Sequence, residues 1–208
     1  MIAIIDYGAG NLTSVRLAFE SLGVPVEVTN QADRIRQASR IVFPGVGAAR
    51  AAMESVRRLG LDTAIRAALE RGIPFLGICL GAQIVFDSSE ENGGVNGMGL
   101  VPGSVKRFQP LDPADKIPHM GWNSVRQVRP HPLLDGIADG AEFYFVHSYY
   151  PAPSCPNHRL GETDYAHVVF TAMIAADNLA ATQFHPEKSG RVGLRLLRNF
   201  SQWNGEPC

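Results

Sequence analysis

The stretch FLGICLGAQ, residues 75–83, decides the fold of this chain. An apolar run ends at Ile78, a cysteine follows, and a helix can begin near Gly81, so the stretch predicts a strand, a sharp turn and a helix. The glycines that flank the cysteine lack a Cβ, which lets neighbouring backbone approach closely and tolerates a strained turn. The pattern G-x-C-x-G therefore has the form of a nucleophile elbow, with sulfur in place of the serine oxygen.

Cys79 at such an elbow would act as a nucleophile. The first N–H groups of the following helix point at the sulfur and favour the thiolate, which is the reactive form. The backbone N–H of Leu80 would supply one donor of an oxyanion hole. The alternative is that Cys79 is a small buried hydrophobe between packing glycines, since free cysteine is among the most buried residue types. A base elsewhere in the chain would favour the first interpretation.

The segment TQFHPEKSG, residues 182–190, can supply that base. His185 and Glu187 are two residues apart, so on an extended backbone their side chains face the same side. A carboxylate beside an imidazole fixes the tautomer and stabilises the imidazolium that forms when the ring accepts a proton. Cys79 would then have both a base and an orienting acid. The alternative is a strand end that runs into a turn, with a solvated histidine and glutamate.

The rest of the chain predicts the class of the fold. Strands are expected at 2–5, 26–28, 41–43 and 74–78, and helices near 12–22, 33–38, 48–59 and 62–71. Strands separated by helices of this length indicate βαβ units, so we expect an α/β fold with a mainly parallel central sheet flanked by helices.

The second half of the chain has a different pattern of residues. From residue 93 to about 128, glycine and proline interrupt short β-like pieces, which predicts an antiparallel β insertion or meander on the main sheet. Further strands are expected at 143–150, 167–175 and 179–186, and a closing helix near 192–203. No linker divides the 208 residues, so we expect one domain over residues 1–208.

Composition excludes several classes of function. The net charge is −1, so no basic field draws the chain to nucleic acid or to an anionic membrane, and no apolar stretch is long enough to span a bilayer. The three cysteines, Cys79, Cys155 and Cys208, are widely spaced, and the six histidines form no ligand pattern. We therefore expect no disulfide framework, no metal site and no cofactor. The opening MIAIIDYG lacks the basic region of a signal peptide, and a cytoplasmic location is expected.

These residues together resemble the class I glutamine amidotransferases, a family in which a G-x-C-x-G-x-Q elbow pairs with a late H-P-E, as GICLGAQ and HPE do here. Other stretches are similar to one branch of that family, the glutaminase subunits of imidazole glycerol phosphate synthase in histidine biosynthesis. They are IDYGAGNLTSV (5–15), FPGVGA (43–48), PHMGWN (118–123), HSYY (147–150) and FHPEKSG (184–190). The resemblance covers essentially the whole chain, with the motifs in the order of the family.

The resemblance implies the fold of that family and a role for each matching residue. Cys79 would attack the side-chain amide of glutamine, His185 would transfer the proton and Glu187 would orient His185. A γ-glutamyl thioester would form, ammonia would leave, and water would then release glutamate. The PGVG segment (44–47) matches the oxyanion strand of the family, in which the N–H of Val46 must turn inward to join that of Leu80.

Five further residues stand at positions where the family holds glutamine: Gly47, Gln83, Glu91, Ser148 and Tyr149. A carboxylate at position 91 suits the α-ammonium group of the substrate. From the residues alone, Glu91 can equally be an acid on a solvated loop, and Gln83 an amide on a helix surface. Ser148 and Tyr149 can equally be an ordinary strand end.

The resemblance also implies a partner, a (β/α)₈-barrel cyclase subunit that forms a heterodimer with the glutaminase. Ammonia would pass through that barrel to join an aminoimidazole ribonucleotide derivative, giving imidazole glycerol phosphate and AICAR. Asn11, Trp122 and Lys188 fall in motifs that the family places at or near this interface, although Trp122 could instead be a core residue. Low glutaminase activity is expected without the partner, since an oxyanion hole unformed at rest withholds stabilisation of the transition state.

Other functions are less compatible with these residues. The glutaminase of pyridoxal phosphate synthase would have the same fold, but PHMGWN argues against it. A catalytically silent module with a redox-active Cys79 has no need for His185 and Glu187, and a cysteine peptidase lacks the late HPE. DYGAGNLT after the first strand invites a dinucleotide-binding loop, but Thr13 stands where the third glycine of that motif belongs.

Overall fold

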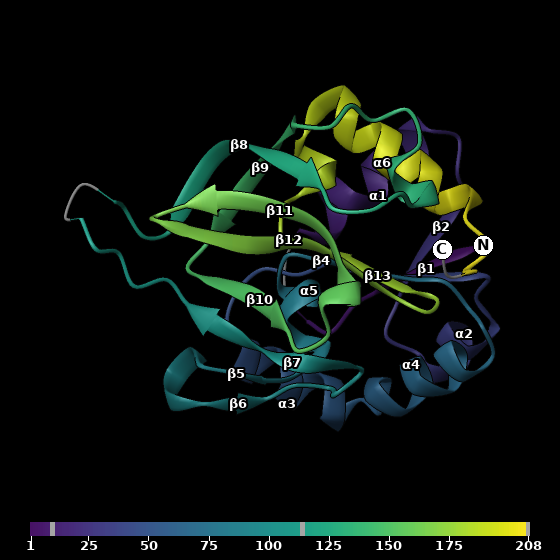
Figure 1. Ribbon diagram of the computed structural model, residues 1–208. Helices are drawn as coiled ribbons and strands as arrows, with labels where there is room; N and C mark the ends of the chain where they lie inside the picture. Colours follow the sequence, from purple (N-terminus) through teal and green to yellow (C-terminus); the bar gives the residue numbers. More distant parts are fainter. Residues whose placement is uncertain (9–10, 113–114, 207–208) are drawn as a thin grey trace.

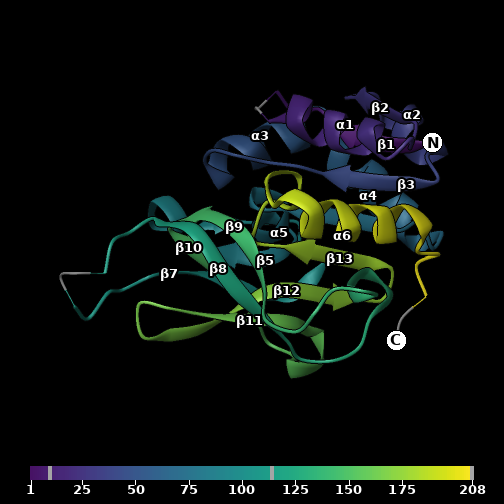
Figure 2. The same cartoon turned by 90° about the horizontal axis from the view of Figure 1, so that it is seen from above.

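The computed structural model describes residues 1–8, 11–112 and 115–206. Positions 9 and 10 of the IDYGAGNLTSV stretch lie outside the described residues, as do positions 113 and 114 and Cys208. Figure 1 gives the arrangement of the helices and strands, and Figure 2 shows the same fold from above.

A nine-stranded sheet forms the centre of the fold, in the order β2-β1-β3-β4-β13-β12-β11-β8-β9. The first five strands are parallel: β2 (Val26–Thr29), β1 (Ile2–Ile5), β3 (Arg40–Phe43), β4 (Phe75–Ile78) and β13 (Leu179–Thr182). All four residues of β1, β4 and β13 are buried, which is the expected burial pattern of parallel strands covered on both faces.

Six helices among the described residues cover the two faces of the parallel half. α1 (Leu12–Ser21) and α6 (Gly190–Gln202) lie on one face, and their apolar side chains share a core cluster with Ile2 and Ile4 of β1 (Figure 1). The other face carries α2 (Ala32–Gln37), α3 (Ala49–Arg58), α4 (Leu61–Glu70) and α5 (Leu80–Ile84). These helices share the second cluster with Ala3 and Ile5, so successive side chains of β1 alternate between the two faces. No helix among the described residues has the length and apolar character needed to cross a membrane.

The same sheet continues with antiparallel strands, β12 (Val168–Ala176), β11 (Arg159–Tyr165), β8 (His119–Gln127) and β9 (Ala141–His147). A second sheet contains β10 (Tyr149–Pro153), β7 (Val101–Arg107), β5 (Phe86–Ser89) and β6 (Val95–Asn96). Four short 3₁₀ turns complete the described elements: η1 (Glu91–Gly93), η2 (Pro132–Leu134), η3 (Pro156–His158) and η4 (Pro186–Lys188).

The predicted class of fold is confirmed, with four differences in detail. One is β5, which was not predicted as a strand. The antiparallel region is an extension of the central sheet, and its first pieces divide between the two sheets, since β7 joins the second and β8 the first. The strand expected at 143–150 is two strands, because the chain leaves one sheet for the other at Ser148. β11 was not predicted, since its sequence RLGETDY alternates too weakly to stand out from a loop.

The register of the sheet brings two distant segments to one edge. β4 and β13 are parallel neighbours, with Ile78 opposite Thr182. Both strands end there, so the chain continues directly into Cys79 after one strand and into Gln183 and His185 after the other. The carboxyl ends of parallel strands are where open α/β sheets carry their sites.

Candidate active site

Cys79 occupies a strained turn between β4 and α5. Its φ of 53° and ψ of −103° lie in a region that residues with a side chain rarely adopt. The flanking glycines make this turn possible: a Cβ on Gly77 would lie 2.6 Å from the carbonyl oxygen of Gly81, and one on Gly81 would overlap the backbone oxygen of Phe43. The backbone N–H of Cys79 donates to Thr182 over 2.7 Å, which ties the elbow to β13.

His185 and Glu187 form a buried pair next to this elbow. His185 Nδ1 lies 2.7 Å from Glu187 Oε1, and the exposed fractions of the two side chains are 1% and 0%. Glu187 is not on an extended strand, as its spacing suggested, because Pro186 starts the turn η4; the carboxylate reaches the imidazole from that turn. Asn11 Nδ2 donates to the same Glu187 oxygen over 2.6 Å, so the carboxylate is held from two sides.

The electrostatics of His185 favour its charged form. Burial alone would lower its pKa, but the Cys79 sulfur and the Glu187 carboxylate raise the pKa to about 10. The other ring nitrogen, Nε2, makes no hydrogen bond within the described part of the chain. With Nδ1 held by the carboxylate, Nε2 is the nitrogen that can exchange a proton with a substrate or with the sulfur.

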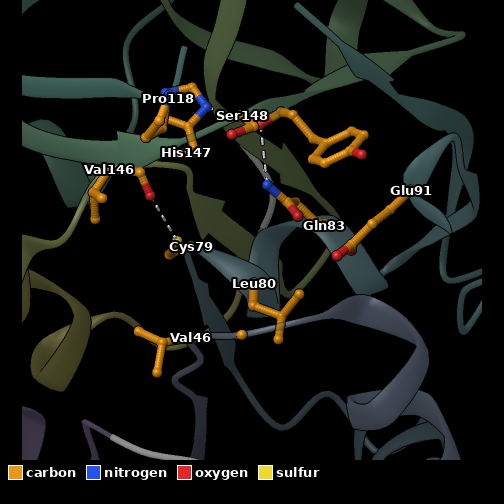
Figure 3. Close-up of a pocket in the computed structure, with 11 residues that line it drawn as sticks. Val46, Cys79, Leu80, Gln83, Glu91, Pro118, Val146, His147 and Ser148 are labelled. Atoms are coloured by element: carbon orange, nitrogen blue, oxygen red, sulfur yellow. Dashed lines mark hydrogen bonds between the residues drawn. The ribbon is translucent and has the colours of Figure 1, made fainter.

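A cavity of about 310 Å³ opens beside Cys79 (Figure 3). Eight of the residues singled out from the sequence line it: Val46, Gly47, Cys79, Leu80, Gln83, Glu91, Ser148 and Tyr149. Three further lining residues, Pro118, Val146 and His147, were not predicted. Pro118 and His147 stand inside the PHMGWN and HSYY stretches, so the signal was present, whereas Val146 is an ordinary residue of β9 and gives none.

One of the two predicted oxyanion donors, the N–H of Leu80, is already engaged in this structure. The N–H of Leu80 donates to the carbonyl oxygen of Gly45 over 3.4 Å. That carbonyl belongs to the same peptide unit as the N–H of Val46. Rotation of this single peptide would therefore remove an acceptor from Leu80 and turn a second donor toward the cavity.

Glu91 is not simply an acid on a solvated loop. Its Oε2 accepts the backbone N–H of Ala49 over 2.8 Å, at the beginning of α3. The same side chain lines the cavity, and Figure 3 shows its carboxylate directed toward Gln83 and Leu80. The residue thus connects the first turn of a helix to the wall of the pocket and brings a negative charge there.

Gln83 is a buried amide within the site. Its Nε2 donates to the backbone oxygen of Tyr149 and to Gln183 Oε1, each over 3.0 Å. Gln183 Nε2 in turn donates to Cys79 Sγ over 3.6 Å. Gln183 was not predicted, although it lies within the TQFHPEKSG segment, because a glutamine in a strand-like stretch carries no signal by itself.

The three residues predicted at a partner interface are each linked to the His185–Glu187 pair, by a direct bond, by sequence or through one intervening residue. Asn11 bonds to Glu187, and Lys188 is exposed directly after it. Trp122 is 53% exposed, so it is not a core residue, and its ring lies 6.2 Å from that of Tyr144 in an edge-on arrangement. Tyr144 accepts the backbone N–H of His185, which connects the exposed tryptophan to the buried pair through one residue.

Among the described residues, no group of three or more His, Cys, Asp or Glu side chains could hold a metal ion. Cys79 and Cys155 are both free thiols. A thiol, an imidazole and a carboxylate lie together beside a pocket with one negative wall, and this set of groups can perform nucleophilic catalysis.

Comparisons with known proteins identify the family of the chain. The family model for class-I glutamine amidotransferases matches residues 3–202. Among solved structures, a glutamine amidotransferase crystal structure matches 99% of this chain and 100% of its own, with a TM-score of 0.76 and 15% identity. PurLQS from Thermotoga maritima matches 96% of both chains, with a TM-score of 0.74 and 17% identity. At these identities the solved structures show the fold alone. The chain belongs to the class I glutamine amidotransferase family.

More similar relatives narrow the assignment within the family. The imidazole glycerol phosphate synthase subunit HisH of Nitrosococcus oceani is 50% identical over 207 residues, covering 98% of each chain. The HisH subunit of Moorella thermoacetica is 51% identical, covering 97% of this chain and 94% of its own. This chain is accordingly a glutamine amidotransferase of the HisH branch, an enzyme subunit of histidine biosynthesis.

Proposed function

We propose that this chain hydrolyses glutamine to glutamate and ammonia through a triad of Cys79, His185 and Glu187. The observation that supports the proposal most strongly is the meeting of the two strand ends, with the strained cysteine after β4 and the buried His185–Glu187 pair after β13. The neighbouring cavity has the size of a site for a small molecule, and one wall is acidic.

The reaction begins with proton transfer between sulfur and imidazole. The Cys79 sulfur and the Glu187 carboxylate raise the pKa of His185, so its imidazole is a strong enough base to accept the thiol proton and leave a nucleophilic thiolate. Cys79 Sγ attacks the side-chain carbonyl carbon of glutamine, and His185 Nε2 gives its proton to the leaving nitrogen as the C–N bond breaks. Ammonia departs and a γ-glutamyl thioester remains. Water, deprotonated by the same nitrogen, then attacks the thioester, and glutamate leaves while the sulfur returns to its starting state.

The pocket residues would hold the substrate during these steps. Glu91 supplies the negative charge that the α-ammonium group requires, and the free oxygen of Gln83 accepts a hydrogen bond. Gly47, Ser148 and Tyr149 line the same cavity and would shape the rest of the binding site. No cofactor or metal is needed for this reaction.

The oxyanion hole would form only when the peptide between Gly45 and Val46 rotates. At rest its carbonyl oxygen accepts a hydrogen bond from the N–H of Leu80. After rotation, the N–H groups of Val46 and Leu80 would both face the developing oxyanion, and one such donor contributes about 2.7–4 kcal/mol. We therefore propose that the resting enzyme has low glutaminase activity.

A cyclase subunit with a (β/α)₈ barrel would be the partner that triggers this rotation. The relatives named above are subunits of imidazole glycerol phosphate synthase. We propose a heterodimer in which Asn11, Trp122 and Lys188 contact the cyclase, and ammonia passes to it for synthesis of imidazole glycerol phosphate and AICAR. An exposed tryptophan is typical of an interface hot spot. The chain would act as one domain over residues 1–208, in the cytoplasm, where Cys79 stays reduced.

A glutamine-analogue affinity label tests the nucleophile directly. The wild-type chain in complex with the cyclase should gain one label by mass spectrometry, on Cys79, and excess glutamine should protect it. Cys79→Ala should gain none, while Cys155→Ala, which removes the other described cysteine, should label like the wild type. Labelling that ignores the Cys79 substitution would contradict the proposal.

A further inference from the structure

Gln183 touches the catalytic sulfur and has no part in the mechanism above. Its side chain is fully buried, and its Nε2 lies 3.6 Å from Cys79 Sγ in hydrogen-bonding geometry. Its backbone N–H donates to Ala172 over 2.8 Å, which fixes the start of the side chain against β12. A buried amide is stable only when its polar atoms are paired, and here the partner of one of them is the sulfur.

A chain of hydrogen bonds fixes which end of this amide faces the sulfur. The backbone oxygen of Tyr149 can only accept, so Gln83 must present its Nε2 to it. The same nitrogen donates its second hydrogen to the nearby side-chain atom of Gln183, which must therefore be the oxygen Oε1. With Oε1 turned toward Gln83, Gln183 directs Nε2, a donor, at Cys79.

The backbone oxygen of Tyr149, where this series of hydrogen bonds begins, is also held by a second donor. His147 Nδ1 lies 2.8 Å from the Tyr149 oxygen and must carry the hydrogen, which leaves Nε2 as an acceptor for His119 Nδ1 at 3.0 Å. Burial lowers the pKa of His147 to about 3, so the ring stays neutral and these donor and acceptor roles persist at neutral pH. The Tyr149 carbonyl is thus held by His147 and Gln83 together.

We propose that Gln183 is a positioning residue for the nucleophile: its Nε2–H holds the sulfur of Cys79 and stabilises the negative charge of the thiolate. An amide neither takes up nor releases a proton in the range where the enzyme works, so Gln183 can donate to the sulfur without competing with His185 for the transferred proton. The proposal rests on the role of Cys79 as nucleophile in the proposed function. The contact itself can be measured without glutamine.

The test is the pH dependence of Cys79 alkylation by iodoacetamide in the full chain, since the thiolate is the form that reacts. Gln183→Met keeps the length of the side chain and removes the donor, and Gln183→Glu replaces the donor with a negative charge. The midpoint of the alkylation profile should rise by about 0.5–1 pH unit in the first variant and by more than about 1 unit in the second. Thr163→Val, which removes a buried hydrogen bond on β11 away from the site, should leave the midpoint unchanged.

Equal midpoints in the wild type and both Gln183 variants would overturn the proposal, because a structural role alone would lower stability without moving the profile. If neither Gln183 variant folds, Gln83→Met decides, since it leaves Gln183 in place but frees its amide to turn. A raised midpoint in that variant supports the proposal and an unchanged one overturns it.

The experiments distinguish failure of the proposed glutaminase function from failure of the Gln183 proposal. A wild-type complex that turns over no glutamine, combined with shifted midpoints in the variants, would refute glutaminase activity and still support the Gln183 contact.

Discussion

The two halves of the candidate active site differ in the strength of the hydrogen bonds that hold them. On the triad side, Glu187 accepts hydrogen bonds of 2.7 and 2.6 Å from His185 and Asn11, and both members of the acid–base pair are buried. On the oxyanion side, the bond from Leu80 to Gly45 is 3.4 Å, and the hydroxyl of Tyr7 lies 3.5 Å from the carbonyl oxygen of Val46. The first set of bonds is short and charge-assisted, and the second is long and neutral.

This difference suggests which part of the site can respond to a partner. The triad follows the ends of two neighbouring buried strands, so moving it would disturb the core. The oxyanion segment is a short connection between β3 and α3 that contains Gly47 at a φ of 102°. Rotating its peptide between Gly45 and Val46 requires the loss of two weak hydrogen bonds, so a binding event of ordinary strength can drive it.

The largest effect should come from removing the base. His185→Asn in the cyclase complex is expected to lower kcat for glutamine hydrolysis by about 10⁴-fold or more, as for other triad bases. His131→Asn is a matched control, because His131 is also a buried histidine but lies away from the cavity. Steady-state glutaminase assays on both variants check this. A loss of less than tenfold in His185→Asn would contradict its role.

A smaller loss is expected when the acid keeps its shape and loses its charge. Glu187→Gln can still present an oxygen to both His185 and Asn11, so the ring stays oriented while the charge that supports the imidazolium is gone. We expect kcat to fall by about 10²–10³-fold. Asn11→Leu removes the second donor and keeps the charge, and it should lose less. The reverse order would show that orientation by Asn11 matters more than charge.

Gly45→Ala separates the two halves of the site. A Cβ there would lie 2.7 Å from the Tyr7 hydroxyl oxygen and 2.8 Å from Leu80 Cβ, so the oxyanion segment must shift while the triad is untouched. Turnover in the complex should fall by about 10²-fold, the cost of one misplaced oxyanion donor. Alkylation of Cys79 by iodoacetamide should keep the wild-type rate. If alkylation fell as far as turnover, the two halves would not be independent.

The smallest effect concerns stability and pH, and it distinguishes two kinds of buried histidine. Burial lowers the pKa of His131 to about 4, so the unfolded chain binds a proton below pH 6.5 that the folded chain does not. Stability is therefore lost as the pH falls from about 6.5 toward 4. His185 behaves oppositely: its raised pKa gives stability that is complete below 6.5 and is lost as the pH rises through about 10.

His131→Asn should therefore recover stability in acid. An asparagine at this position can still accept the N–H of Leu133, as His131 does. Relative to the wild type, the free energy of unfolding should improve by about 2 kcal/mol between pH 7 and pH 5. Urea unfolding at the two pH values measures this change. An equal acid loss in both proteins would show that His131 is already protonated in the folded chain.

The local pattern around Cys79 predicted more of this molecule than any other stretch. The glycines at 77 and 81, the strand before the cysteine and the helix after it all follow from the need for close backbone approach, and all are present. The parallel half of the sheet follows from alternating apolar runs and helices. The division of β9 and β10 between two sheets could not be predicted, because it depends on pairing partners far away in the chain.

The hydrogen-bond networks between side chains also could not be predicted from the sequence. The contacts of Gln183 with Gln83 and with Cys79 join residues about a hundred positions apart, and they exist only once the strand register is set. The same holds for His119 and His147, whose rings meet across β8 and β9. The hydrogen bond from the N–H of Leu80 to the carbonyl oxygen of Gly45 also depends on the orientation of one peptide. The residue types do not specify that orientation, because glycine allows several backbone conformations.

The most direct measurement compares two rates in the isolated chain and in the complex with the cyclase subunit and its nucleotide ligand. One is alkylation of Cys79 by iodoacetamide at neutral pH, which depends on the triad side. The other is glutamine turnover, which depends on both sides. We predict an unchanged alkylation rate and a turnover that rises by about 10²-fold or more on complex formation. Equal turnover in the isolated chain and the complex would contradict a resting site with a formed triad and an unformed oxyanion hole.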